Sequence, residues 1–246
     1  MWSISAANPI EQELLTRIKL YIDEVRQEWR LALQDKLFWG LGIISIVLTI
    51  AFFGNIGDFL EYIESRPGCV LNDAILNALE AHDMSGPIFF IIYAGAALVF
   101  IFCLPCPWTF LFAAHIFLLQ NLIRALCMYF TPLEPSPDII PLHDPLLLPY
   151  VYRESVKLKD LFFSGHTATL TVYCIVFRRY IVWRRIFKIS TVLMGVLLLI
   201  QHCHYTIDIL GAVPMSYFAY LLAKYIWKRA GLPFKKTLLE KKIKAI

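Results

Sequence analysis

The sequence predicts an all-α, polytopic membrane protein built as a six-helix transmembrane bundle. Of its 246 residues, 59% are hydrophobic and only 17% are charged, and the mean hydropathy is +0.62. Soluble domains have about half apolar and about a quarter charged residues, so this composition excludes an ordinary soluble domain and a disordered chain. Six spans of about 20 residues, the length that crosses a hydrocarbon core of roughly 30 Å, use about half the chain and leave no room for a large extramembrane domain.

Residues 1–36 precede the first apolar run and are predicted to form an amphipathic N-terminal segment. From Ile10 to Leu33, apolar side chains recur at steps of three and four residues, as on one face of a helix. Asn8 is a candidate cap and Pro9 stands at the first helical position. We expect this helix to lie at the membrane interface against the bundle, with partner binding as the alternative. The mixed charge before the first apolar run argues against a cleavable signal peptide.

Residues 37–227 contain the predicted membrane domain, and residues 228–246 form a basic C-terminal tail. The six expected spans lie at about 37–56, 86–104, 108–130, 163–182, 186–203 and 205–227. Residues 71–82 are expected to form a short helix between the first two spans. Residues 131–160 hold six prolines, through which no regular helix runs, so this stretch is expected to be an irregular loop.

The basic residues predict how the spans are oriented. Of 23 Lys and Arg residues, five precede the first span, five lie between the fourth and fifth, and eight follow from Lys224 onward. Six spans place these three regions on one side, which the positive-inside bias makes cytoplasmic. The loop 131–160 has three basic and five acidic residues and lies on the opposite side. We therefore expect a multi-pass integral membrane protein.

Cysteines and histidines do not form a recognisable metal or disulfide pattern. The six cysteines are scattered, mostly inside apolar runs, as expected for small buried residues rather than a disulfide framework. Cys103 and Cys106 have redox spacing but stand beside two prolines, which favours a structural turn. His202 and His204 have no neighbouring ligand cluster, so neither a metal nor another cofactor is expected. The modest net charge of +4 argues against nucleic acid as a partner.

Two short polar motifs interrupt the apolar spans. The first runs from Asp160 to Thr167 and contains Ser164, Gly165 and His166. Ser164 is a good helix cap, and Gly165 would let an anion approach the free N–H groups and positive end of the helix that follows. This is the outline of a phosphate site.

The second motif begins with His204, 38 residues after His166, and ends with Asp208. Residues four apart share one helical face, so the Asp208 carboxylate can orient the His204 imidazole and stabilise its cationic form. Isolated histidines near a membrane boundary are ordinarily interfacial residues. Ionisable groups within an apolar bundle are costly and tend to be functional, so we expect His166 and His204 to act together, both on the non-cytoplasmic face.

These two motifs resemble the catalytic motifs of the sphingomyelin synthase family, a branch of the type 2 phosphatidic acid phosphatase superfamily. The stretch from Arg124 to Thr131 also resembles that family's preceding motif, in which an Arg at the outer end of a span is followed by Thr and a Pro-rich stretch. The resemblance covers residues 120–227. The earlier chain is similar only in having two spans, and the family's Pro-rich motif between them is not recognisable.

The resemblance implies a catalytic membrane domain that transfers a phospho-head group from a phospholipid donor to a diacylglycerol or ceramide-like acceptor. His204, oriented by Asp208, would attack phosphorus, and His166 would act as general acid and then as general base. Arg124 would neutralise phosphate oxygens. Asp160 would hold a cationic head group or tune His166, with an ordinary loop carboxylate as the alternative.

A lipid phosphate phosphatase would use the same three residues with water as acceptor. Phosphatases of this superfamily carry Arg-Pro at the end of the first motif and Ser-Arg shortly before the last His. Here these positions read Thr131-Pro132 and Leu197-Leu198, which favours a diester over a dianionic monoester. A non-catalytic lipid-binding or scaffold protein is the third reading, disfavoured because all the catalytic residue types are present at the expected spacing.

Overall fold

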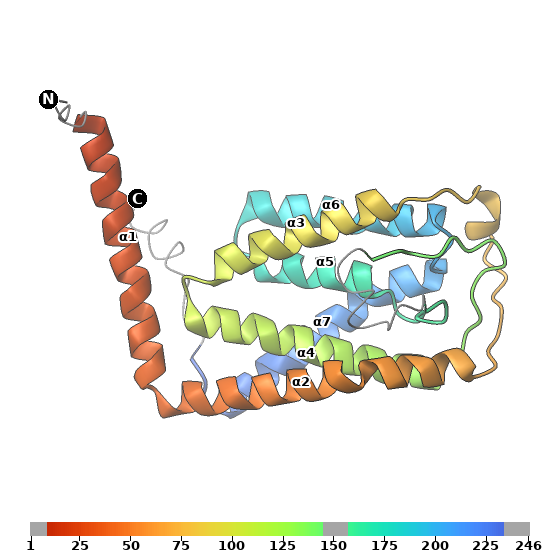
Figure 1. Ribbon diagram of the computed structural model, residues 1–246, viewed down its shortest axis with the longest axis horizontal. Coiled ribbons are helices and arrows are strands. Elements are labelled where there is room, and N and C mark those ends of the chain that lie inside the picture. Colours follow the sequence, from red (N-terminus) through yellow and green to blue (C-terminus); the bar gives the residue numbers. More distant parts are fainter. Residues whose placement is uncertain (1–8, 145–156, 234–246) are drawn as a thin grey trace, which may run out of the picture.

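Seven α-helices and one 3₁₀ turn make up the part of the chain that the structure, a computed structural model, describes: residues 9–144 and 157–233. No strand occurs within these residues. In chain order the elements are α1 (Pro9–Gln34), α2 (Lys36–Ser65), η1 (Leu76–Ala78), α3 (Ser85–Cys103), α4 (Pro107–Phe130), α5 (Gly165–Val176), α6 (Ile181–Ile200) and α7 (Thr206–Arg229). The predicted all-α membrane bundle is confirmed, with helices α2 to α7 packed together (Figure 1).

Four of these helices, α2, α3, α4 and α7, are long and apolar enough to cross a membrane. The bundle also turns large apolar side chains outward. Ile50, Phe90 and Ile189 are 67%, 74% and 68% exposed, and many similar side chains surround them. So extensive an apolar surface on a helical bundle is suited to hydrocarbon and not to water. The protein is therefore an integral membrane protein.

Helix α5 lies at the centre of the bundle, where it contacts α3, α4, α6 and α7 (Figure 1). Most of its side chains are accordingly buried, and Ala168 and Leu170 are fully inaccessible to solvent. The helix has 12 residues, which corresponds to roughly 18 Å at about 1.5 Å per residue. The residues that open α5 therefore lie within the bundle.

The two larger apolar cores both include side chains of α5. One is mainly aromatic and joins α2, α4 and α7; it includes Phe38, Trp108, Phe112, Tyr220 and Trp227. The other joins α3, α5 and α6; it includes Leu170, Phe177, Phe187, Met194 and Leu198. A polar contact crosses the first core, because His115 of α4 is hydrogen-bonded to Ser45 of α2 at 2.7 Å and to the Trp227 indole at 3.2 Å. His115 thus links three helices.

The span boundaries differ from the sequence prediction at α2. The helix continues beyond residue 56 to Ser65, and its polar last turn contacts the chain that precedes α5. The Glu64 carboxylate accepts hydrogen bonds from the backbone N–H groups of Leu158 and Lys159, both at 3.1 Å. A span predicted from hydropathy ends where the apolar side chains end, so the prediction does not include this polar extension of the helix.

The predicted span 163–182 is also wrong in its extent, because α5 ends at Val176 and α6 begins at Ile181. Arginine side chains make the turn between the two helices. Arg178 donates to the carbonyl of Ile175 at 3.2 Å, and Arg184 donates to the carbonyl of Arg178 at 3.2 Å. The first bond satisfies a carbonyl that α5 leaves free at its end, and the second holds the turn that follows.

Helix α1 extends away from the bundle at a steep angle to the other helices (Figure 1). Its last turns are attached to the bundle: Ala32 is buried, and the Trp29 indole donates to the carbonyl of Leu104 at 2.8 Å. Asp35 then ends α1 and caps α2, accepting from the Leu37 N–H at 2.9 Å. The cap expected at Asn8 lies outside the described residues.

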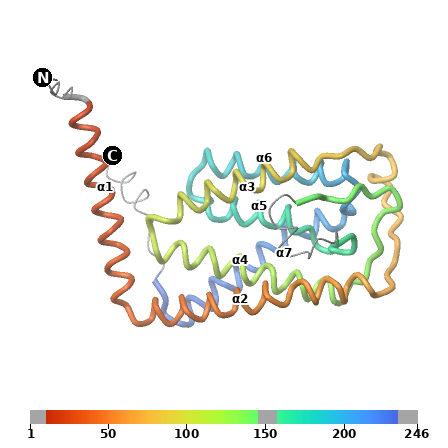
Figure 2. Tube along the Cα trace, in the orientation of Figure 1, coloured from red at the N-terminus to blue at the C-terminus, as the bar shows by residue number. Residues whose placement is uncertain are grey.

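At the opposite end, segments 66–84 and 131–144 run close to the start of α7 (Figure 2). They are joined by an isolated bridge, in which the N–H of Cys69 donates to the carbonyl of Pro132 at 3.1 Å. The helix expected at 71–82 reduces to the single turn η1. These segments cover the end of the bundle at which both polar motifs lie.

Candidate active site

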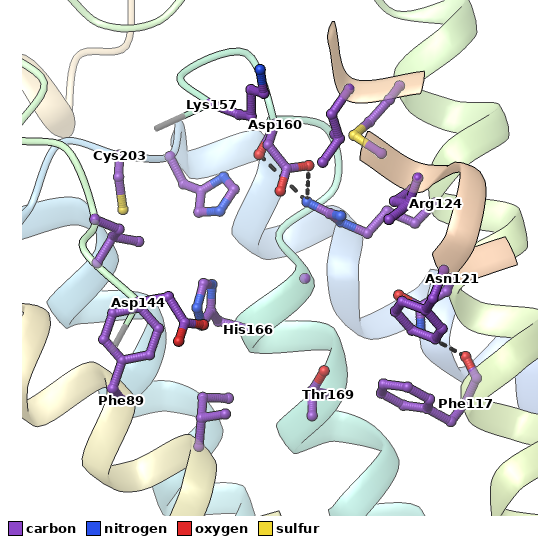
Figure 3. Close-up of a pocket in the computed structure, with 18 of the residues that line it drawn as sticks. Phe89, Phe117, Asn121, Arg124, Asp144, Lys157, Asp160, His166, Thr169 and Cys203 are labelled. Atoms are coloured by element: carbon purple, nitrogen blue, oxygen red, sulfur yellow. Dashed lines mark hydrogen bonds and ion pairs between the residues drawn. The ribbon is translucent and has the colours of Figure 1, made fainter. Parts of the chain in front are cut away.

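A cavity of about 330 Å³ opens at this end of the bundle. Its wall includes His166, His204, Arg124, Asp160 and Gly165, which come from α4, α5 and the segments before α5 and α7. Figure 3 shows His166 on α5, with Arg124 and Asp160 joined by dashed lines on another part of the wall. The structure thus brings the two polar motifs and the arginine of the preceding motif around one space.

His204 and Asp208 form a buried pair at the start of α7. His204 is 4% exposed, Asp208 is fully buried, and their Nδ1 and Oδ2 atoms are 3.2 Å apart. A carboxylate only accepts hydrogen bonds, so this contact favours the tautomer of a neutral imidazole in which Nδ1 carries the proton and Nε2 keeps its lone pair. The same Oδ2 accepts from the Tyr205 N–H at 3.0 Å, which fixes the carboxylate on the first turn of α7.

His166 stands on the first turn of α5, after the cap that the sequence predicts. The Ser164 hydroxyl accepts from the Thr167 N–H at 3.4 Å, and the Ser164 N–H donates to the Asp208 carbonyl at 3.1 Å. That second bond joins the two motifs directly. The His166 ring makes an edge contact with Phe89 of α3, with ring centroids 5.8 Å apart.

Arg124 is fixed against the start of α5. Its Nη2 is 2.5 Å from Oδ1 of Asp160, and its Nε donates to the Phe163 carbonyl at 2.8 Å. A Cβ atom at Gly165 would lie 3.2 Å from the guanidinium carbon. Gly165 therefore makes room for a cation beside the helix N-terminus, and Asp160 is the partner of that cation.

Sequence reasoning missed several side chains of the cavity. Lys157 lines it with its side chain 8% exposed, and its ammonium nitrogen is 4.0 Å from a carboxylate oxygen of Glu61. Asp144 lines it too and accepts from the Tyr93 hydroxyl at 2.6 Å. Lys157 and Asp144 are among the charged residues of the loop 131–160, but their spacing in the sequence does not distinguish them from ordinary loop residues.

An outer group of polar contacts holds the loops around the cavity. The Lys159 ammonium donates to Glu134 at 2.8 Å and to the Arg66 carbonyl at 2.7 Å, and Glu134 also accepts from the Gly68 N–H at 2.8 Å. The hydrogen bond from Lys159, followed by that from Gly68, holds the pKa of Glu134 below its usual value. Glu134 is thus an anion that joins three loop segments.

Within residues 9–144 and 157–233, no three His, Cys, Asp or Glu side chains are grouped as metal ligands. All six cysteines are free thiols. Cys103 and Cys106 are both buried at the turn between α3 and α4, where the Cys106 N–H donates to the Cys103 carbonyl at 2.9 Å. This pair forms the turn that the neighbouring prolines predict.

Comparison with known proteins gives one family match. Residues 159–225 match a family described as PAP2 superfamily C-terminal, and no curated protein matches the chain significantly. The matched region contains Asp160, His166, His204 and Asp208, whereas Arg124 precedes it. Membership of this superfamily indicates an enzyme that acts on phosphate esters, as phosphatase or phosphotransferase. The match, over the region that holds both histidines, supports placing this chain in the PAP2 superfamily.

Proposed function

We propose that the protein transfers a phospho-head group from a phospholipid to the hydroxyl of a second lipid through a phosphohistidine, as its resemblance to sphingomyelin synthases implies. The observation that carries the proposal is the His204–Asp208 pair, whose histidine borders the same cavity as His166 and Arg124. A nucleophile held by a carboxylate, a second proton-transfer group and a cation are the parts that phosphoryl transfer requires.

In the first step Nε2 of His204 attacks phosphorus, and the bond from phosphorus to the diacylglycerol oxygen breaks. The His166 imidazolium gives its proton to that oxygen. The product is a phosphohistidine on His204, whose positive ring keeps its Nδ1–H bond to Asp208. Arg124 lies beside the helix N-terminus, and both stabilise charge on the phosphate oxygens.

In the second step neutral His166 takes the proton from an acceptor hydroxyl, and the acceptor oxygen attacks phosphorus. The bond from phosphorus to Nε2 breaks and His204 is restored. The acceptor is a diacylglycerol or ceramide-like lipid. No metal or other cofactor takes part in this scheme, since each proton and electron pair has a donor and an acceptor among these groups.

The apolar part of the cavity wall supports a lipid substrate. Phe52, Phe53 and Ile56 of α2 and Phe117 of α4 line it together with the polar groups. Phe53 is 37% exposed and stacks on Phe117 with ring centroids 6.5 Å apart. A wall that runs from charged groups to apolar rings at the bundle surface fits a phosphate ester with attached acyl chains.

The positions that carry arginines in the related phosphatases support transfer to a lipid over hydrolysis. Thr131 donates to the Cys127 carbonyl at 2.5 Å, and Leu198 is fully buried in the core of α3, α5 and α6. A diester, with one negative charge on phosphorus, needs fewer cations than a monoester.

Lipid phosphate hydrolysis is the second candidate function, and Lys157 favours it. This side chain adds a second cation to the cavity wall beside Arg124, as a dianionic phosphate monoester would require. In that case Lys157→Gln should impair the enzyme far more with phosphatidic acid than with phosphatidylcholine.

The test uses purified protein with phosphatidylcholine or phosphatidylethanolamine labelled in the head group. Label should pass to added diacylglycerol or ceramide, and His204→Ala and His166→Ala should each abolish the transfer. His82→Ala is the matched control, because His82 is an exposed loop residue outside the cavity. Rapid release of phosphate from phosphatidic acid, with no exchange from any diester, would replace the transferase by the phosphatase.

A further inference from the structure

A carboxylate from the first connecting segment binds the start of α7. Oδ2 of Asp73 accepts from the Thr206 N–H at 2.6 Å, and Oδ1 accepts from the Thr206 hydroxyl at 2.9 Å. Oδ1 also accepts from the N–H groups of Ile75 and Leu76 at 3.1 and 3.2 Å. Asp73 therefore joins η1 to the first residue of α7.

Helix α7 takes this cap from a distant part of the chain because its own preceding residue does not supply one. The Tyr205 hydroxyl points elsewhere, donating to the Glu134 carbonyl at 2.9 Å and accepting from the Leu71 N–H at 3.3 Å. The first N–H groups of a helix need acceptors. Asp73 accepts from Thr206 and Asp208 accepts from Tyr205, so two carboxylates hold consecutive residues directly after His204.

We propose that Asp73 is a positioning residue for His204: it fixes Thr206, and through it the first turn of α7, so that the His204–Asp208 pair keeps its geometry. This inference rests on the proposed function only in taking His204 as the nucleophile. Asp73 touches neither the cavity nor the reacting atoms. It also lies outside residues 159–225, the region of the family match, so the N-terminal half of the chain completes the site.

The surroundings of Asp73 keep its carboxylate charged. Burial raises its pKa, but the hydrogen bonds from Thr206, Leu76 and Ile75 together outweigh burial, and the net pKa is lowered. The carboxylate lies at the N-terminal end of α7, where the helix dipole favours a negative charge. A neutral or shortened side chain at this position would lose the charge-assisted bonds to Thr206.

The experiment compares Asp73→Ala, Asp73→Asn and a matched control in purified enzyme. Asp35→Ala is the control, because Asp35 also caps a helix, α2, at the opposite end of the bundle. We measure kcat and KM for head-group transfer, the midpoint of thermal unfolding, and the rate at which diethyl pyrocarbonate modifies His204, read by mass spectrometry of its peptide. The last measurement needs no substrate.

We expect Asp73→Ala to lower kcat by about 10- to 100-fold with little change in KM, since small displacements of a catalytic group have effects of this order. Modification of His204 should slow in the same variant. Asp73→Asn, which keeps one acceptor oxygen, should recover part of the loss, and Asp35→Ala should behave like the parent enzyme. Should Asp73→Ala fail to fold, Asp73→Asn and Thr206→Val should show the same decrease in kcat to a smaller extent.

An unchanged kcat in folded Asp73→Ala, an equal loss in Asp35→Ala, or a loss confined to KM would each overturn the proposal. The modification of His204 by diethyl pyrocarbonate needs no substrate, so it distinguishes a failure of the positioning role from a failure of the proposed function. If the parent enzyme moves no head group while the modification of His204 still depends on Asp73, the transferase fails and the positioning role stands.

Discussion

Replacing Gly165 by Ala tests how closely the cavity is built around Arg124. The new Cβ would lie 3.2 Å from both Cζ and Nε of Arg124, so the guanidinium must move by a few tenths of an ångström. It is held on two sides, at 2.8 Å by the Phe163 carbonyl and at 2.5 Å by Asp160. Movement away from Gly165 therefore weakens one of these bonds.

The size of the effect follows from the bond that is lost. A hydrogen bond to a charged group contributes about 1.5–3 kcal/mol. About 1.4 kcal/mol corresponds to a factor of ten in rate, so kcat/KM should fall by about 10- to 100-fold. Helix stability should not fall, because Ala is a better helix former than Gly by about 1 kcal/mol.

The assay is kcat/KM for a labelled donor lipid, with the thermal unfolding midpoint measured in parallel. Gly86→Ala is the matched control: Gly86 also opens a helix, α3, and a Cβ there would meet nothing within 4 Å. In an Arg124→Ala background, Gly165→Ala should have no further effect. Full activity of Gly165→Ala, or an equal loss in both backgrounds, would refute the contact between Gly165 and Arg124 as the cause.

Three further predictions concern the nucleophile, the loops and the topology. Asp208→Asn should lower kcat by about 10⁴-fold, as expected when the imidazole takes the wrong tautomer, with the unfolding midpoint measured as a check on folding. Because the pKa of Glu134 is lowered, its contact with Lys159 stabilises the fold above the usual Glu pKa and is lost as pH falls through the lowered value; acid unfolding of Glu134→Gln should lack this contribution. A single cysteine at Asp138 should react with an impermeant reagent from the non-cytoplasmic side, whereas one at Arg184 should not, and the reverse labelling would invert the proposed orientation.

The sequence predicted the helical fold because apolar runs of span length are a local signal. It predicted the pairing of His204 with Asp208 because four residues make about one helical turn. The structure places the two histidines around one cavity, although they are 38 residues apart, and the resemblance to a known family anticipated this. The helical cap at Ser164 is likewise a local feature, and the structure contains it.

What sequence analysis missed depends on contacts between distant parts of the chain. Asp73 and Thr206 are 133 residues apart, and nothing in the segment around Asp73 distinguishes it from a surface loop. The ion pair between Asp160 and Arg124 also forms only because α4 packs beside the start of α5. The early end of α5, by contrast, involves a local contact, in which the Arg178 side chain donates to the Ile175 carbonyl three residues before it.

The shortness of α5 has a consequence for the depth at which the proposed chemistry takes place. If the arginine-bearing turn after Val176 lies at one boundary of a hydrocarbon layer about 30 Å thick, a helix of roughly 18 Å ends about 12 Å below the other boundary. His166 stands at that inner end. In the proposed transfer, a donor head group must then leave the hydrated surface and move toward the membrane interior before it reacts. To reach that depth, the hydroxyl of a lipid in the same leaflet moves a shorter distance from its resting position than the phosphate does. Each water molecule, in contrast, must move from the hydrated surface to the same depth as the head group.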